Sequence, residues 1–440
     1  MRTTSLRPIA ALISFVALAA CGSKAGDPAR QYGPDPYLPE PHEYLLPPMS
    51  VPKAIGWKAG ETPRVAAGVK IEALATGLEH PRTLYTLPNG DILVVESNSP
   101  GTEPYRPKDF IAGKVKARAG ADAEGGNRIT LLRDADGNGK PELRTIFIEH
   151  LYSPYGIVLV GDTLYVADTD AILAFNYVPG ETQITSPGVK LADLPAGPID
   201  HHWTKSMTAS ADGTKLYVGV GSNSNITENG MAVEDGRAAI YEVDRLTGAK
   251  RIFASGTRNP TSLAFEPQTR QLFAVVNERD EIGPDLVPDY LTSIRQDGFY
   301  GWPYSYWGSH VDVRVHPQRP DLVAQAIKPD YALSSHVAPL GLLFSDGQHL
   351  SPLFANGAFV SEHGSWDRSP LNGYQVIFVP FVNGRPVGQP IPVVTGFLGE
   401  DNETVHGRPV GLALDRSGAL LVADDVGNTV WRVSATQPGS

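Results

Sequence analysis

The sequence predicts an all-β protein that folds as a six-bladed β-propeller. The first observation is a pattern that is clearest in GRPVGLALDRSGALLVADDVGNTVWRV, residues 407–433. Strand-like runs with a period-two pattern lie at 410–414, 419–423 and 429–433, and turns rich in Gly, Asp and Ser separate these runs. Successive side chains of a strand point to opposite faces, so this period of two is typical of a β-meander and not of a helix.

The second observation is that the pattern recurs along the chain, which gives six copies in total. Each copy has a polar or Pro-containing start, then two apolar strands joined by a turn. The copies start at Pro81-Arg82, Pro154-Tyr155-Gly156, His202, Arg258-Asn259-Pro260, residues 336–341 and Arg408-Pro409. Irregular spacing between copies implies loops of unequal length, which fits propeller blades better than a tightly packed solenoid.

The first 20 residues are predicted to be a lipoprotein signal peptide. Arg2 and Arg7 precede an apolar run over 9–20, which is too short to span a bilayer. The run ends in LAAC, which resembles a bacterial lipobox, where the cysteine is lipidated and becomes the mature N-terminus. An ordinary signal peptide followed by an incidental cysteine is the alternative. Cys21 is the only cysteine of the chain, so we expect no internal disulfide.

Residues 21–65 are predicted to be a flexible Pro-rich tether, because PDPYLPEPHEYLLPP has no hydrophobic periodicity. Residues 66–436 then form one propeller domain, for which 41% hydrophobic residues supply a core. A net charge of −11 argues against binding of nucleic acid or anionic lipid. The lipid on Cys21 would be the only membrane contact. Gly22 after the cysteine predicts the periplasmic side of the outer membrane of a Gram-negative bacterium.

A short acidic segment, LLRDADGNGKPELRTIF, lies between the first and second copies. Asp134, Asp136, Asn138 and Glu142 have the spacing of an oxygen-ligand calcium loop. The last ligand position of such a loop holds Thr145 here instead of glutamate, and no flanking helices are predicted. A solvated hairpin turn is therefore the favoured interpretation, with a second calcium site as the alternative.

Polar and charged side chains recur at the starts of the six copies. The innermost strand of a propeller blade begins near the axis, so these side chains are expected to surround one pocket. They are Arg82, Tyr155, His202, Arg258, Asn259, His336 and Arg408, with His406 two residues before the last. Any one of them alone fits a surface residue or a strand-end ion pair. Together, guanidinium and imidazole groups suit a planar ligand with several carboxylates, because Arg donates two parallel hydrogen bonds to a carboxylate.

Five motifs extend this interpretation. They are His202 ten residues before an Asp-Gly turn, GTRNP at 256–260, YGWP at 300–303, EHGSW at 362–366 and GRPVG at 407–411. With them the chain resembles, from about residue 66 to residue 433, the pyrroloquinoline quinone (PQQ)-dependent sugar dehydrogenases. Within that family it is similar to the L-sorbosone dehydrogenase-like branch. The resemblance implies a six-bladed propeller with PQQ on its axis, and oxidation of an aldose or sugar-derived aldehyde by hydride transfer to the quinone.

The resemblance also implies roles for individual residues. His202 corresponds to the general base, with His201 as the next candidate, and Arg258 with Asn259 to the pair at the reactive carbonyl of the quinone. Arg408 corresponds to an arginine that pairs with PQQ carboxylates. The other expected cofactor contacts are Arg82, His336, His363 and His406. The three histidines stand where the glucose enzymes carry, in that order, a threonine, a lysine and an arginine, yet each still donates hydrogen bonds to a carboxylate.

A calcium ion beside the cofactor is implied as well. In the family it bridges PQQ and backbone carbonyls in a loop that corresponds to residues 277–281, where Asp280 and Glu281 stand; a solvated acidic loop is the alternative. Two other functions are weighed against a dehydrogenase. A calcium-dependent lactonase would need a ring of Asp, Glu and Asn on the axis, and a non-catalytic scaffold would need no recurring ionisable groups. The Arg and His residues favour the dehydrogenase, with a periplasmic cytochrome or quinone as electron acceptor.

Overall fold

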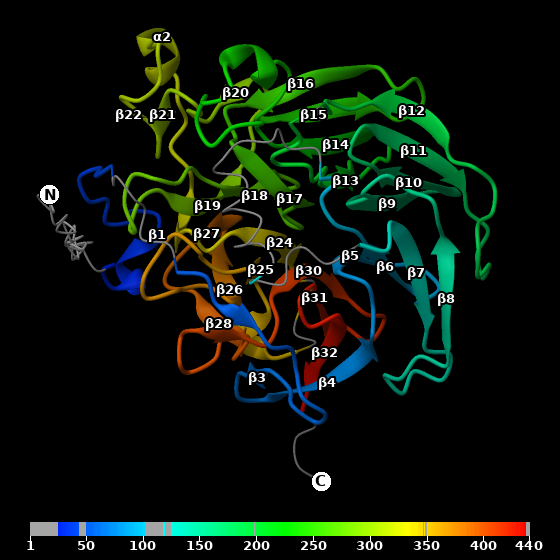
Figure 1. Ribbon diagram of the computed structural model, residues 1–440. Helices are drawn as coiled ribbons and strands as arrows, with labels where there is room; N and C mark the ends of the chain where they lie inside the picture. The colour runs from blue at the N-terminus through cyan, green and yellow to red at the C-terminus, as the bar shows by residue number, and fades with distance from the viewer. Residues whose placement is uncertain are drawn as a thin grey trace, which may run out of the picture.

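The computed structural model describes residues 25–43, 50–101, 118, 125–197, 199–345, 347 and 350–436. In this part of the chain, six sheets of at least four strands are set around a common centre (Figure 1). The six-bladed propeller that the repeats predict is confirmed. The signal peptide and Cys21 lie outside the described residues, so the lipidation of Cys21 stays a prediction.

Each blade is a four-stranded antiparallel meander that runs outward from the axis. Blades 1 and 2 contain β5 (Pro81–Thr86), β6 (Ile92–Glu96), β7 (Arg128–Arg133), β8 (Leu143–Ile148), β9 (Gly156–Val160), β10 (Thr163–Ala167), β11 (Ala171–Asn176) and β12 (Val189–Asp193). Blades 3 and 4 contain β13 (Met207–Ala209), β14 (Lys215–Val220), β15 (Ala239–Asp244), β16 (Lys250–Ser255), β20 (Gly298–Phe299), β17 (Asn259–Phe265), β18 (Leu272–Asn277), β19 (Pro288–Ser293) and β23 (Tyr331–Ser335). In blade 3, β20 is an additional strand that pairs parallel with β16. Blade 5 contains β24 (Pro339–Phe344), β25 (Gly357–Glu362), β26 (Gln375–Val382) and β28 (Ile391–Thr395).

Blade 6 closes the ring with strands from both ends of the propeller. Its first three strands are β30 (Pro409–Leu414), β31 (Leu420–Asp424) and β32 (Thr429–Ala435). The fourth, β4 (Val69–Thr76), precedes blade 1 in the sequence and pairs antiparallel with β32. This pairing holds the first and last blades together without any disulfide.

The hydrophobic core lies between neighbouring blades. The middle strands are apolar on both faces, as ILVVE of β6 and TLYVA of β10 illustrate, because each face packs against another blade. Leu93 and Val95 of blade 1, for example, share a fully buried cluster with Leu164 and Val166 of blade 2. Burial of such a side chain stabilises the fold by about 1.5–3 kcal/mol.

The segment before the propeller differs from its prediction. The sequence predicts a flexible tether over 21–65, but the described residues 25–43 and 50–65, here called the N-terminal strap, pack on the propeller. The strap contains η1 (Pro28–Gln31), β1 (Tyr32–Gly33), β2 (Lys53–Ala54) and β3 (Arg64–Val65). These strands pair with β23, with β29 (Thr404–Val405) and with β28. Single polar contacts add to the pairing, such as Gln31 Nε2 donating to the carbonyl of Asp285 at 2.7 Å, and such contacts leave no periodic pattern in the sequence.

Short elements complete the fold. They are η2 (Met231–Glu234), β21 (Ser305–Tyr306), β22 (His310–Val311), α2 (Pro320–Val323), η3 (Pro352–Phe354) and β27 (Arg385–Pro386). Among the described residues, no helix has the length and apolar character needed to cross a membrane.

Candidate active site at the propeller axis

Two sets of strand ends meet on one face of the propeller. Arg82 is the second residue of β5, Asn259 is the first residue of β17, and Arg408 directly precedes β30. The second strand of each blade runs antiparallel to the first, so its last residue lies beside the start of the first strand, as Asp424 pairs with Pro409 in blade 6. The face is therefore lined by the starts of the innermost strands and by the ends of their neighbours.

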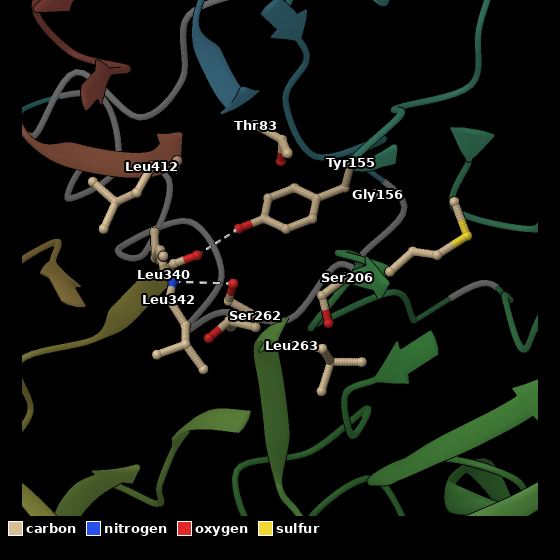
Figure 2. Close-up of a pocket in the computed structure, with 13 residues that line it drawn as sticks. Thr83, Tyr155, Gly156, Ser206, Ser262, Leu263, Leu340, Leu342 and Leu412 are labelled. Carbon is tan, nitrogen blue, oxygen red and sulfur yellow. Dashed lines mark hydrogen bonds between the residues drawn. The ribbon is translucent and has the colours of Figure 1, made fainter. Parts of the chain in front are cut away.

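A small cavity lies on the axis, among the inner strands. Figure 2 shows residues of several inner strands around it, with the Tyr155 hydroxyl donating across the axis to the Leu340 carbonyl at 3.2 Å. The cavity has a volume of about 50 Å³, room for one or two water molecules. This cavity is too small for a ligand of several fused rings, so a ligand of that size needs space outside it.

The first cluster of charged residues surrounds the buried carboxylate of Asp425, directly after β31. Arg82 Nη1 donates a short hydrogen bond to Asp425 Oδ2. His363 Nε2 lies 3.0 and 3.1 Å from the two carboxylate oxygens, and His80 Nδ1 lies 3.1 Å from the Asp425 carbonyl. We call His80, Arg82, His363 and Asp425 the Asp425 cluster.

Burial decides the protonation of the histidines in this cluster. The pKa of His363 is lowered to about 4, mainly by desolvation and also by the charges of Arg408 and Arg82, although the Asp425 carboxylate acts in the opposite direction. Desolvation likewise lowers the pKa of His80. Burial alone would raise the pKa of Asp425, but His363, His80 and Arg82 hold it well below its usual range. At neutral pH the charges of the cluster are therefore the carboxylate and the guanidinium, and the histidines donate as neutral rings.

Arg408 lies near this cluster without a counter-charge. Within the described part of the chain it forms no ion pair, and its guanidinium makes one hydrogen bond, from Nη2 to the Tyr374 hydroxyl at 3.3 Å. The Nε atoms of Arg408 and Arg82 are both buried without a hydrogen-bond partner. Buried donors of this kind are costly when unpaired, so the arrangement fits an anionic ligand that accepts from these two arginines.

The second cluster surrounds Asp280, in the loop after β18. Arg258 is held by Asn225, through Nε to the carbonyl and Nη2 to Oδ1, both at 3.0 Å. Its Nη1 donates to the Glu278 carbonyl at 2.6 Å, and its Nη2 lies 3.6 Å from Asp280 Oδ2. The N–H groups of Arg258 thus face acceptors of the protein, so this arginine acts on its surroundings through its charge.

His336 and Asp367 complete this second cluster. His336 Nδ1 lies 3.0 Å from Asp280 Oδ1 and Nε2 lies 3.0 Å from the Gly283 carbonyl. A carbonyl only accepts, so Nε2 carries a proton, and the carboxylate is the acceptor for Nδ1. Asp367 brings a carboxylate whose Oδ1 is buried without a partner, and ligand atoms of Asp280, His336 and Asp367 lie within 4.8 Å of one another. We call Arg258, Asp280, His336 and Asp367 the Asp280 cluster.

His202 lies next to the Asp280 cluster. Its Nδ1 is 2.8 Å from the Ser222 carbonyl and 3.0 Å from Ser222 Oγ. Because the carbonyl only accepts, Nδ1 carries the proton and Nε2 carries the lone pair. Desolvation and the charge of Arg258 hold the pKa of His202 well below its usual range, so the ring is neutral. The ring of His201 stands edge-on to it, with centroids 4.7 Å apart.

Most of the residues predicted for the site meet on this face, and two lie apart. His406 stacks on Trp57 of the strap, with ring centroids 5.0 Å apart, and its Nδ1 lies 3.1 Å from the Gly56 carbonyl. The Glu281 side chain is exposed, and its backbone N–H donates to Asp367 Oδ2 at 3.3 Å. Of the two carboxylates predicted at the metal, the structure thus brings Asp280 into a cluster and leaves Glu281 outside.

Several residues of the site were not predicted. Asp425, Asp367 and Asn225 hold the arginines and histidines in place, yet none of them starts a copy of the repeat. A signal for part of this set exists in the sequence, because polar residues stand at the end of the second strand, or within two residues after it, in every blade. They are Glu96, Asp168, Ser222, Glu278, His363 and Asp425, and all but His363 are buried.

The acidic hairpin between β7 and β8 is separate from this face. Ligand atoms of Asp134, Asp136 and Glu142 lie within 4.8 Å of one another. Their carboxylates accept from backbone N–H groups of the same loop, for example Asp134 Oδ2 from Gly139 at 2.7 Å and Glu142 Oε2 from Ala135 at 2.7 Å. These internal bonds agree with the solvated hairpin turn that the sequence favours.

Comparison with known proteins gives relatives for the whole propeller. A pyrroloquinoline quinone-dependent pyranose dehydrogenase of Coprinopsis cinerea is 23% identical over 429 residues, which cover 83% of this chain and 54% of that protein. The chain thus spans about half the length of that relative. An uncharacterised protein of Borreliella burgdorferi is 27% identical over 293 residues, covering 64% of this chain and 76% of that protein.

Solved structures share the fold. The PQQ domain of the Coprinopsis cinerea pyranose dehydrogenase superposes with a TM-score of 0.69 at 21% identity, covering 88% of this chain and all of that domain. A Trichoderma reesei enzyme of carbohydrate-active family AA12 superposes with a TM-score of 0.68 at 18% identity, covering 89% of this chain and 99% of that one. The family model described as TrAA12-like matches residues 123–291 and 320–436, more than half of the sequence. The chain therefore belongs to the TrAA12-like family.

Proposed function

We propose that the chain is a PQQ-dependent dehydrogenase that oxidises an aldose sugar or a sugar-derived aldehyde of the sorbosone type. The observation that carries the proposal is His202, whose hydrogen bond to the Ser222 carbonyl leaves Nε2 as an unprotonated base. Membership of the TrAA12-like family and the similarity to a PQQ-dependent pyranose dehydrogenase support a sugar as substrate.

In this proposal His202 takes the proton from a hydroxyl group of the substrate. For an aldose this is the C1 hydroxyl of the hemiacetal, and for an aldehyde it is a hydroxyl of the hydrate. Nε2 accepts the proton, and the Ser222 carbonyl then stabilises the charged ring through Nδ1. When bound, PQQ supplies a quinone that accepts a hydride from the substrate carbon. The positive charge of Arg258 favours negative charge that develops nearby, although its N–H groups remain with the protein.

The face that carries the two clusters fits a polycarboxylated cofactor. Arg408 and Arg82 would hold carboxylates, because each has a buried Nε without a partner. His363 lies beside Arg82, because both contact Asp425, and Asn259 directly follows Arg258. Both would therefore contact the cofactor. His406 stacks on Trp57, so it would contribute only through the backbone next to Arg408. For calcium, the carboxylates of Asp280 and Asp367 are the ligands of the right type, and Asp367 Oδ1 is the oxygen without a partner. His336 donates at both ring nitrogens and offers no lone pair to a metal.

The two alternative functions receive less support. A lactonase needs a ring of Asp, Glu and Asn that is free to bind calcium, but here Asp425 is paired with Arg82 and His363. A non-catalytic scaffold would not need buried arginine donors without hydrogen-bond partners, because such donors only destabilise the fold when no ligand binds them. The similarity to a dehydrogenase and the state of His202 both favour an oxidoreductase.

The test compares two substitutions at the proposed base. His202→Ala should keep the fold and PQQ binding but lose about 10²- to 10⁴-fold in turnover, the span usual for a general base. Ser222→Ala is the matched control: it removes the hydroxyl and keeps the carbonyl that orients Nδ1, so turnover should fall far less. Near wild-type turnover of His202→Ala would assign the role of base to another group, with His201 examined next.

The proposal extends to location. Lipidation at Cys21 would anchor the protein to the outer membrane on its periplasmic side, with a cytochrome or quinone of the periplasm as electron acceptor. The multiply acylated terminus of a lipoprotein anchors stably, whereas a single acyl chain does not. Cys21→Ala should therefore move the protein from the membrane fraction to the soluble fraction. An unlipidated wild type would contradict the proposal.

A further inference from the structure

The N-terminal strap is fixed to the propeller at three points that lie beside the site. The hydrogen bonds are Tyr32 Oη to Glu362, Ser50 N to the Trp366 carbonyl and Trp57 Nε1 to Asp424 Oδ2, at 3.0, 2.9 and 2.7 Å. Glu362, Trp366 and Asp424 each precede, by one position, a residue of the two clusters. The strap therefore contacts the same segments of the chain that carry the residues of the two clusters.

The contact at Asp424 is the most direct of the three. This carboxylate is fully buried at the end of β31 and accepts four hydrogen bonds. Oδ1 accepts from the backbone N–H groups of Arg408 and Gly427 at 2.8 and 2.7 Å. Oδ2 accepts from the indole N–H groups of Trp57 and Trp431 at 2.7 and 3.1 Å. The same carboxylate thus joins the strap to the backbone of Arg408.

Two glycines make this arrangement possible. A Cβ atom on Gly407 would lie 2.0 Å from Asp424 Oδ2, and one on Gly427 would lie 2.2 Å from the same oxygen and 2.7 Å from Trp57 Nε1. Real Cβ atoms do not come this close, so a side chain at either position would displace the Asp424 carboxylate from its hydrogen-bond partners.

Trp57 also fixes the segment before Arg408 directly. Its ring stacks on His406 at 5.0 Å with an interplanar angle of 25°, and the His406 ring nitrogen bonds to the Gly56 carbonyl. Trp57 packs edge-on against Trp431 of blade 6, with centroids 5.3 Å apart. Trp57 thus holds His406 through ring stacking, and it contacts the Asp424 carboxylate that accepts from the backbone N–H of Arg408.

We propose that Trp57 is a positioning residue for Arg408, acting through the Asp424 carboxylate and the His406 ring, so that the strap is part of the ligand site. The inference rests on the proposed function, in which Arg408 binds a carboxylate of PQQ. A side chain that holds an unpaired arginine in place lowers the cost of ordering it when the ligand binds.

The experiment measures the dissociation constant of PQQ for the apo form of the full chain by calorimetry. Trp57→Phe keeps the ring that stacks on His406 but removes the N–H that bonds to Asp424. We expect binding to weaken about 10-fold, as loss of an outer hydrogen-bond partner does at metal sites. Trp307→Phe is the control, because it makes the same exchange at a buried tryptophan that lies beside β21 and β22, away from the axis. The PQQ affinity of this variant should change less than about twofold.

A double-mutant cycle with Arg408→Ala separates positioning from general loosening of the fold. If Trp57 acts through Arg408, Trp57→Phe should weaken PQQ binding less than about twofold once Arg408 is gone. A structural role would give additive losses, with Trp57→Phe costing the same in both backgrounds, and would overturn the inference. If Trp57→Phe does not fold, Trp57→Leu, which also lacks the N–H group, replaces it in the same cycle.

The outcomes separate this inference from the proposed function. A wild type that does not bind PQQ overturns the proposed function and the inference with it. A wild type that binds PQQ, together with Trp57→Phe that binds equally well, overturns the inference alone. If Trp57→Phe weakens PQQ binding in the wild-type background but not in the Arg408→Ala background, the result supports both the inference and the proposed function.

Discussion

Asp425 and Asp280 each follow the second strand of a blade, but their clusters differ in the kind of polar atom that is left without a hydrogen-bond partner. In the Asp425 cluster a single carboxylate faces Arg82 and two histidines, and the atom left without a partner is a guanidinium nitrogen. In the Asp280 cluster two carboxylates face one arginine and one histidine, and the atom left without a partner is a carboxylate oxygen, Asp367 Oδ1. One cluster thus has a spare donor and the other a spare acceptor.

This difference indicates which part of a ligand each cluster suits. Spare guanidinium donors, with the unpaired Arg408 beside them, favour an anion such as a carboxylate. A spare buried carboxylate oxygen favours a hard cation. A cofactor with several carboxylates, together with a calcium ion, would satisfy both clusters at once.

The first prediction contrasts the two carboxylates by the same isosteric change. Asp425→Asn leaves the buried Arg82 guanidinium without its counter-charge, so the free energy of unfolding should fall by about 3–5 kcal/mol. Asp367→Asn removes a charge that has an unpartnered oxygen, so its cost should stay within about 1 kcal/mol. Urea unfolding of both variants measures the difference. Equal losses would mean that the fold depends on the charges of Asp425 and Asp367 to the same extent.

The second prediction concerns pH and the His363 side chain. Its pKa is about 4 in the fold and near 6.5 in the unfolded chain, so between these values the unfolded state binds the extra proton. The contribution of His363 to the free energy of unfolding is therefore complete above pH 6.5, and the free energy of unfolding should fall by about 3 kcal/mol as the pH drops to 4. His363→Gln should flatten that part of the curve in denaturant titrations at successive pH values. An unchanged slope would show that His363 titrates normally; His80, whose pKa is also lowered, contributes in the same direction.

The third prediction concerns the anion-binding end. Arg408→Ala removes a charge-assisted hydrogen bond to the ligand, worth about 1.5–3 kcal/mol, and should weaken PQQ binding by one to two decades. Stability should change little, because Arg408 forms no ion pair within the described residues. Calorimetry and thermal unfolding measure the two effects separately. Unchanged affinity in a folded variant would remove Arg408 from the site.

The sequence predicted the architecture because repetition is visible in it. The strands expected at 410–414, 419–423 and 429–433 are β30, β31 and β32 with shifts of at most two residues at either end. Side chains at the starts of the copies could be predicted to converge, because every inner strand begins near the axis. Arg82, Asn259 and Arg408 needed no other information to be placed on one face.

The contacts between copies could not be predicted in the same way. Asp425 reaches Arg82 and His363 across three blades, and such pairs depend on side-chain geometry that a periodic pattern does not encode. The strap was missed for a related reason, because Trp57 and Tyr32 make isolated side-chain contacts within a Pro-rich segment, and such contacts follow no periodic pattern. Polarity at the ends of the second strands was the signal that could have found Asp425.

The last prediction concerns the cation-binding end and has the smallest expected effect. If Asp280 and Asp367 hold calcium, Asp367→Asn should weaken calcium binding to the chelator-treated apo protein about 10-fold, because it removes a charged ligand oxygen. Glu281→Gln is the matched control: it removes one carboxylate from the same loop, but from an exposed side chain outside the cluster, so affinity should stay within about twofold. Calorimetric titration with calcium measures both variants beside the wild type. Equal affinities for all three would assign the metal to backbone carbonyls of the loop instead. The Asp280 cluster would then not be the cation-binding part of the site.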